Sequence, residues 1–163
     1  MARVFEKIRC QSEYVMRVLG TGHRENVYHR ALITALNKAG IQHRSEVACP
    51  IWFMGECVGF GRADLVIDDV VIEIKANKSA PQKTSPQLEK YIVSLSQSER
   101  RCFQGMVVNF NQNSGIVNVY TGDSKLFERS VKRKIESAPP IFIKRARAFE
   151  ELNKFKYQSG QRK

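Results

Sequence analysis

Two acidic residues and one lysine are spaced so that they share one face of an expected β-hairpin. The segment 62–76 has β-branched residues on both sides of Asp68-Asp69, which predicts two short strands joined by a two-residue turn. Because side chains alternate along a strand and cross-strand partners keep a constant register, Asp64 is expected to face Glu73. Lys75 lies two residues after Glu73 and therefore on the same face.

The same register predicts the rest of the hairpin. Its expected cross-strand pairs are Ile67 with Val70, Leu65 with Ile72, and Arg62 with Lys75. The face opposite the charged one is wholly apolar and suits a core; it consists of Ala63, Leu65, Ile67, Val70, Ile72, Ile74 and Ala76.

Two carboxylates directly opposite each other repel, and a divalent cation between them would remove that repulsion. Carboxylate oxygens are ligands that Mg²⁺ and Mn²⁺ accept, and a nearby lysine can position water or stabilise developing charge. The set Asp64, Glu73 and Lys75 therefore suits metal-dependent hydrolysis of a phosphodiester bond. The alternative is an ordinary solvated face of an antiparallel sheet.

These residues also resemble a known family. Asp64 followed by Glu73-Ile74-Lys75 is similar to the D…(D/E)-x-K signature of the PD-(D/E)XK nuclease superfamily, and the surroundings resemble its GxxExxY branch. The motifs that carry this resemblance run in order from residue 22 to residue 110: Gly22-His-Arg-Glu25-Asn-Val-Tyr28, Arg62-Ala-Asp64, Glu73-Ile-Lys-Ala76, Gln87-Leu-Glu-Lys-Tyr91 and Gly105-Met-Val-Val-Asn-Phe110. The chain has Gly61-Arg62-Ala63 where the family has a proline before the first aspartate.

The resemblance implies a restriction-endonuclease-like α/β sandwich, with a mixed central β-sheet flanked by helices, and it assigns roles to residues. Asp64, Glu73 and the carbonyl of Ile74 would bind Mg²⁺ or Mn²⁺, and Lys75 would be catalytic. Glu25 would join or support the metal site, although it could instead only complement the dipole of its helix. The remaining assignments are Gln87 to the catalytic group and Tyr28, Arg62 and Tyr91 to substrate binding.

Apolar periodicity and turn residues predict the elements that hold these groups. Helices are expected over 3–19, 24–39, 86–97 and 123–137. Strand material is expected over 46–60, with a turn at Gly55-Glu56 and a short return through Val58, then in the hairpin, then over 106–110 and 116–120. A final element is expected over 142–155, after Pro139-Pro140.

The chain of 163 residues suits one domain, and we expect a nuclease-like domain over 1–137 followed by a basic extension over 138–163. Residues 130–163 contain ten Lys or Arg and three acidic residues, so this segment contributes +7 of the net charge of +11. Such an excess favours contact with phosphates, and Lys144, Arg145 and Arg147 are assigned to substrate binding. A merely solvated basic tail is the alternative.

No apolar run approaches the roughly 20 residues that span a bilayer, and the N-terminus lacks the core of a signal peptide. We therefore expect an intracellular protein, monomeric or homodimeric, with no membrane partner. The favoured function is a metal-dependent deoxyribonuclease that processes DNA ends or single strands in repair or recombination. The alternatives are a non-catalytic protein that binds or packages nucleic acid on a nuclease fold, an RNA nuclease, and an anti-restriction or repair accessory.

Overall fold

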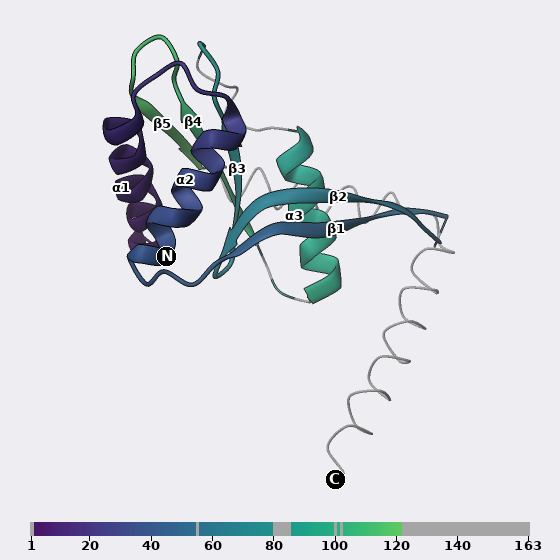
Figure 1. Cartoon of the computed structure of the whole chain (residues 1–163). Coiled ribbons are helices and arrows are strands. Elements are labelled where there is room, and N and C mark those ends of the chain that lie inside the picture. The colour runs from purple at the N-terminus through teal and green to yellow at the C-terminus, as the bar shows by residue number, and fades with distance from the viewer. Residues whose placement is uncertain (1, 55, 80–85, 100, 102, 122–163) are drawn as a thin grey trace.

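The computed structural model describes residues 2–54, 56–79, 86–99, 101 and 103–121 (Figure 1). In chain order these form α1 (Ala2–Leu19), α2 (Glu25–Lys38), β1 (Arg44–Phe53), β2 (Glu56–Ile67), β3 (Val70–Lys75), α3 (Pro86–Glu99), β4 (Gln104–Phe110) and β5 (Val117–Thr121). This order matches the prediction as far as the fifth strand. The helix expected at 123–137, the element at 142–155 and the basic extension lie outside the described residues. No described helix is long and apolar enough to cross a membrane.

The sheet has five strands in the order β1-β2-β3-β4-β5. Its neighbours are antiparallel except for β3 and β4, which are parallel, so the chain must cross over between these two strands, and α3 lies in that connection. The helices α1 and α2 cover one face of the sheet and α3 covers the other (Figure 1). The predicted fold class, a mixed central sheet flanked by helices, is confirmed.

Both faces of the sheet are packed. On the side of α1 and α2, the core joins helix residues such as Ile8, Leu32 and Leu36 to the predicted apolar face of the hairpin. On the side of α3, a second core joins Leu88, Ile92 and Leu95 to Val66, Val71 and Val107. Glu73, on the charged face of the hairpin, is buried, so that part of the face is not a solvated surface.

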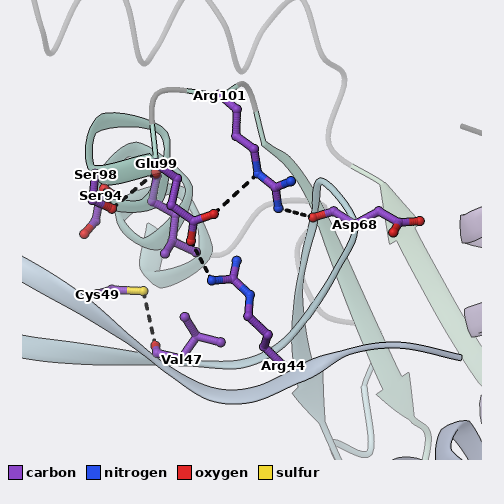
Figure 2. Close-up of polar contacts among 9 residues, drawn as sticks. Arg44, Val47, Cys49, Asp68, Ser94, Ser98, Glu99 and Arg101 are labelled. Carbon is purple, nitrogen blue, oxygen red and sulfur yellow. Dashed lines mark hydrogen bonds and ion pairs between the residues drawn. The ribbon is translucent and has the colours of Figure 1, made fainter. Parts of the chain in front are cut away.

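The hairpin forms as predicted around its turn. The pairs Leu65↔Ile72 and Ile67↔Val70 are in the expected register, and the turn residue Asp68 has a positive φ of 51°. Figure 2 shows how the turn is tied to the end of α3: Arg101 donates a hydrogen bond to the main-chain carbonyl of Asp68 and pairs with Glu99. Glu99 also pairs with Arg44 at 2.7 Å, which fixes the start of β1 to the same point.

The first half of the hairpin differs from the prediction in three ways. The short return through Val58 and the first hairpin strand are one continuous strand, β2, which pairs with β1 along most of its length. The pairing of β2 with β3 stops at Leu65↔Ile72, one pair before Asp64 and Glu73. The phase of β2 also changes at Asp64, because Ala63 packs in the core of α3 whereas Leu65 packs in the core of α1 and α2. The expectation that Ala63 and Leu65 share one face was therefore wrong.

The outer halves of β1 and β2 extend past α3 as a two-stranded arm (Figure 1). Its large apolar side chains are exposed; they include Ile51, Phe53, Met54, Val58 and Phe60.

Two glycines let α3 approach the sheet closely. A Cβ at Gly61 would lie 2.5 Å from the ring of Tyr91, and a Cβ at Gly105 would lie 2.8 Å from the side chain of Ile92. Atoms do not pack at such distances, so a side chain at either position would force the α3 side chain opposite it to move. Gly61 on β2 and Gly105 on β4 thus allow α3 to pack closely against these two strands.

Candidate functional site

The structure brings Asp64, Glu73 and Lys75 together where β2 separates from β3. Glu73 is buried, with only 2% of its side chain exposed. Its Oε1 accepts a hydrogen bond from Lys75 Nζ at 2.7 Å, whereas its Oε2 is buried and has no hydrogen-bond partner among the described residues. A buried carboxylate oxygen without a partner is costly, so this atom is the feature of the site that most needs an explanation.

The electrostatics of the pair follow from this burial. Desolvation raises the pKa of Glu73, the hydrogen bond from Lys75 lowers it, and the negative charges of Asp64 and Glu25 raise it further; the net direction is upward. For Lys75, burial lowers the pKa, but the hydrogen bond to Glu73 and the surrounding carboxylates outweigh it, so the net pKa is raised. Lys75 is therefore firmly protonated, and it holds Glu73 through one oxygen.

Asp64 lies just beyond the end of the β2–β3 ladder, and its side chain takes the place of a main-chain hydrogen-bond acceptor there. Its Oδ2 accepts a hydrogen bond from the main-chain N–H of Ile74 at 2.7 Å. Because β2 has left the ladder at this point, the side chain of Asp64 satisfies a main-chain donor that a strand would otherwise satisfy. This contact fixes the carboxylate of Asp64 beside the strand that carries Glu73.

Glu25 reaches the site from another element. It is the first residue of α2, and its Oε1 lies 3.8 Å from Lys75 Nζ, with 47% of its side chain exposed. The acidic residue therefore lies both in the first turn of a helix, where its charge complements the dipole, and beside the lysine of the site. The two interpretations of Glu25 from the sequence are compatible in this position.

Tyr28, which was assigned to substrate binding, is instead in the core. Its side chain is fully buried and its ring stacks on Phe110 with centroids 4.6 Å apart. Its hydroxyl donates to the carbonyl of Gly20 at 2.7 Å and approaches Gln112 Oε1 at 3.3 Å. Gln112 in turn accepts from the N–H of Gly22, whose positive φ of 94° favours glycine. The first motif thus builds the connection that starts α2 and so places Glu25.

The Gln87 and Tyr91 side chains interact on the first turns of α3, as their spacing predicted. Gln87 Nε2 donates to the Tyr91 hydroxyl at 2.7 Å, and the Tyr91 ring lies against Gly61. Arg62 does not join Lys75; it forms an ion pair with Glu46 at 2.7 Å and has 70% of its side chain exposed. The basic residues Lys144, Arg145 and Arg147 lie outside the described residues.

Asn109 supports the site, and sequence reasoning gave it no role. It is fully buried opposite Lys75 in the parallel ladder. Its Oδ1 accepts from the N–H of Asn77 at 2.9 Å and its Nδ2 donates to the carbonyl of Ser79 at 3.3 Å. Asn109 thereby fixes the chain that follows Lys75. Its place in the Gly105–Phe110 motif was the signal that could have identified it.

Among the described residues, no group of three or more His, Cys, Asp or Glu is arranged to hold a metal ion. A site here would rest on two carboxylates and a main-chain oxygen. The sequence model of the PD-(D/E)XK nuclease superfamily matches residues 2–119, which run from α1 into β5. The chain belongs to the PD-(D/E)XK nuclease superfamily.

Other comparisons add little to this membership. No curated protein matches the chain. One similar solved structure is the crystal structure of SSO0001, with 20% sequence identity and a TM-score of 0.42; the match covers 68% of this chain and 57% of that chain. In this chain Asp64 lies on β2 and Glu73-Ile74-Lys75 on β3.

Proposed function

We propose that this PD-(D/E)XK protein is a Mg²⁺- or Mn²⁺-dependent deoxyribonuclease of the GxxExxY branch. It would hydrolyse phosphodiester bonds during processing of DNA ends or single strands, in repair or recombination, within a compartment that contains DNA. The observation that carries the proposal is the buried Oε2 of Glu73, which lacks a hydrogen-bond partner beside Asp64 and Lys75.

The residues present fit a divalent cation. Oε2 of Glu73, which no donor in the described part of the chain satisfies, is available as a ligand. Asp64 is held nearby, because its Oδ2 accepts a hydrogen bond from the N–H of Ile74. The N–H and C=O of one strand residue point to the same side, so the Ile74 carbonyl is directed toward Asp64 as well. Asp64, Glu73 and the Ile74 carbonyl would hold the cation, and the cation would supply positive charge that activates water and stabilises the phosphate.

Lys75 contributes a fixed positive charge. It is protonated, a quarter exposed, and oriented by Glu73 at 2.7 Å and Glu25 at 3.8 Å. In this position its ammonium group stabilises negative charge that develops on the phosphate during hydrolysis. Glu25 would keep the lysine directed toward the site and would balance its charge.

Gln87 and Tyr91 extend the site toward the substrate. Their hydrogen bond places a polar pair on the first turns of α3, and Tyr91 contacts the strand that carries Asp64. The Q-x-x-x-Y element resembles that of nucleases acting on ends and single strands, which supports this class of substrate. We assign Tyr28 a positioning role in place of substrate binding, because its hydroxyl is buried.

A cleavage assay tests the proposal. The purified full chain is incubated with single-stranded, blunt-ended and nicked DNA and with RNA, in Mg²⁺, Mn²⁺ or Ca²⁺. We expect cleavage of DNA in Mg²⁺ or Mn²⁺ and none in Ca²⁺. Asp64→Asn should lose cleavage, whereas Asp68→Asn is the matched control, because asparagine tolerates the positive φ of that exposed turn residue.

Three outcomes would contradict the proposal in different ways. Cleavage of RNA alone would overturn the assignment to DNA. Binding of DNA without cleavage by the wild-type protein would favour a non-catalytic protein on a nuclease fold. Equal cleavage by wild type and Asp64→Asn would show that the activity does not come from this site.

A further inference from the structure

A histidine outside the signature contacts the main chain of Asp64. His29 lies on α2, and its Nε2 is 3.2 Å from the main-chain oxygen of Asp64. A carbonyl oxygen only accepts hydrogen bonds, so Nε2 is the donor in this contact. The other ring nitrogen, Nδ1, lies 3.8 Å from Glu46 Oε1, and only 14% of the histidine side chain is exposed.

Glu46 is held in a sparsely populated backbone conformation at the same place. Its φ is 55°, in the left-handed region that is unfavourable for a residue with a side chain. In the β1–β2 register Glu46 falls opposite Asp64, yet the ladder passes from Ser45↔Leu65 to Val47↔Ala63 without pairing them. Such strain persists only where the surroundings hold it. The side chain of Glu46 forms an ion pair with Arg62 at 2.7 Å, and its Oε1 lies 3.8 Å from His29 Nδ1.

The main chain of Asp64 needs support from outside the sheet, because Asp64 is paired with neither β1 nor β3. The β2–β3 ladder ends at Leu65, and the pairing with β1 skips Asp64. In the described part of the chain, the side chain of Asp64 accepts a hydrogen bond from the N–H of Ile74 and its main chain accepts one from His29. Together these two contacts fix both ends of the residue.

We propose that His29 is a positioning residue that fixes the main chain of Asp64 and thereby sets the affinity of the metal site. This inference rests on the proposed function, because it takes Asp64 as a ligand. It also gives Arg62 a different role from the one the sequence suggested, since Arg62 holds Glu46. His29 acts through Asp64, and the proposed role requires no contact between His29 and the substrate.

The test measures binding of Mn²⁺ to the full chain, from the electron paramagnetic resonance signal of the free ion, with no substrate present. His29→Ala should weaken binding by about tenfold or more, as is usual when a residue that orients a ligand is lost. His29→Gln places an amide N–H near the position of Nε2 and should restore most of the affinity. His29→Asn is too short to reach Asp64 and should behave like His29→Ala. The matched control is His43→Ala, because His43 bonds only locally, to the carbonyl of Ile41 at 3.0 Å.

The outcomes separate this inference from the proposed function. If wild type does not bind Mn²⁺, the metal site itself is wrong. If wild type binds and His29→Ala binds equally well, the positioning role is wrong and the metal site stands. If His29→Gln and His29→Asn lose affinity equally, the hydrogen bond to Asp64 is not the cause, and the inference also fails. Thermal unfolding of each metal-free variant identifies a variant that does not fold; the comparison of His29→Gln with His29→Asn then decides.

Discussion

Glu73→Gln keeps the size of the side chain and removes its charge. The substitution therefore separates two effects of the buried carboxylate, its cost to folding stability and its contribution to metal binding. The wild-type side chain is 2% exposed, with Oε1 bonded to Lys75 and Oε2 without a partner. Glutamine can keep an oxygen toward Lys75, while its amide group cannot serve as an anionic ligand. The substitution should therefore change metal-free and metal-bound stability in opposite directions.

In the metal-free protein we expect Glu73→Gln to raise the melting temperature at neutral pH. Burial raises the pKa of Glu73, and the bond from Lys75 does not reverse this, so the folded protein binds a proton there more tightly than the unfolded chain. Stability then falls as pH rises through the interval between the unfolded pKa and the raised folded pKa, and above it the ionised group is a net cost. The advantage of the glutamine variant should vanish as pH is lowered to the ordinary carboxyl range.

With metal present the order should reverse. A free Mn²⁺ concentration one hundred times the dissociation constant stabilises the folded wild-type protein by about 2.7 kcal/mol. For a domain of this size each kcal/mol moves the melting temperature by about 2–4 °C, so the wild type should gain roughly 5–11 °C. Glu73→Gln should gain almost nothing, because one of the two carboxylate ligands is lost.

Differential scanning calorimetry with and without Mn²⁺ measures both effects. The matched control is Glu99→Gln, which removes the same charge from the ion pairs with Arg44 and Arg101 at the other end of α3 (Figure 2). It should keep the full gain from Mn²⁺. A full Mn²⁺ gain in Glu73→Gln would refute the ligand assignment. A lower metal-free melting temperature in that variant would show that the bond to Lys75 outweighs the cost of burial.

Three further predictions follow from the site, the core and the basic segment. Lys75→Ala should abolish single-turnover cleavage with nearly unchanged DNA affinity, with exposed Lys38→Ala as control; wild-type cleavage by the variant would remove the lysine from the mechanism. Gly105→Ala should destabilise the fold by about 1–3 kcal/mol in urea denaturation, because its Cβ would lie 2.8 Å from an α3 side chain. Gly59→Ala should not destabilise the fold, because Gly59 has open space around it. Equal stability of the two variants would refute the close packing at Gly105. Charge reversal of the three basic residues in 144–147 should flatten the salt dependence of DNA binding, by about 0.9 in log–log slope for each phosphate that the protein no longer neutralises; an unchanged slope would place the binding surface elsewhere.

Local patterns were sufficient for most of the elements. The helices at 3–19, 24–39 and 86–97 were predicted from apolar spacing, and α1, α2 and α3 lie within two residues of these bounds. The hairpin register was predicted from alternation and a two-residue turn, both of which depend on neighbours in sequence, and it was confirmed at Leu65↔Ile72 and Ile67↔Val70. The roles assigned to Asp64, Glu73 and Lys75 remain predictions, although the structure brings the three together.

What the sequence could not determine depends on contacts between distant segments. Glu73 is buried on a face that the alternation predicted only as charged, and Tyr28 lies in the core, where it contacts Phe110 and Gln112. The break in alternation at Asp64 coincides with the left-handed backbone of Glu46, on another strand. A sequence pattern reports the periodicity of one segment, and burial depends on what covers that segment. The sequence by itself therefore identified which residues could do the chemistry, and only the tertiary structure decided which of their atoms are left without a partner.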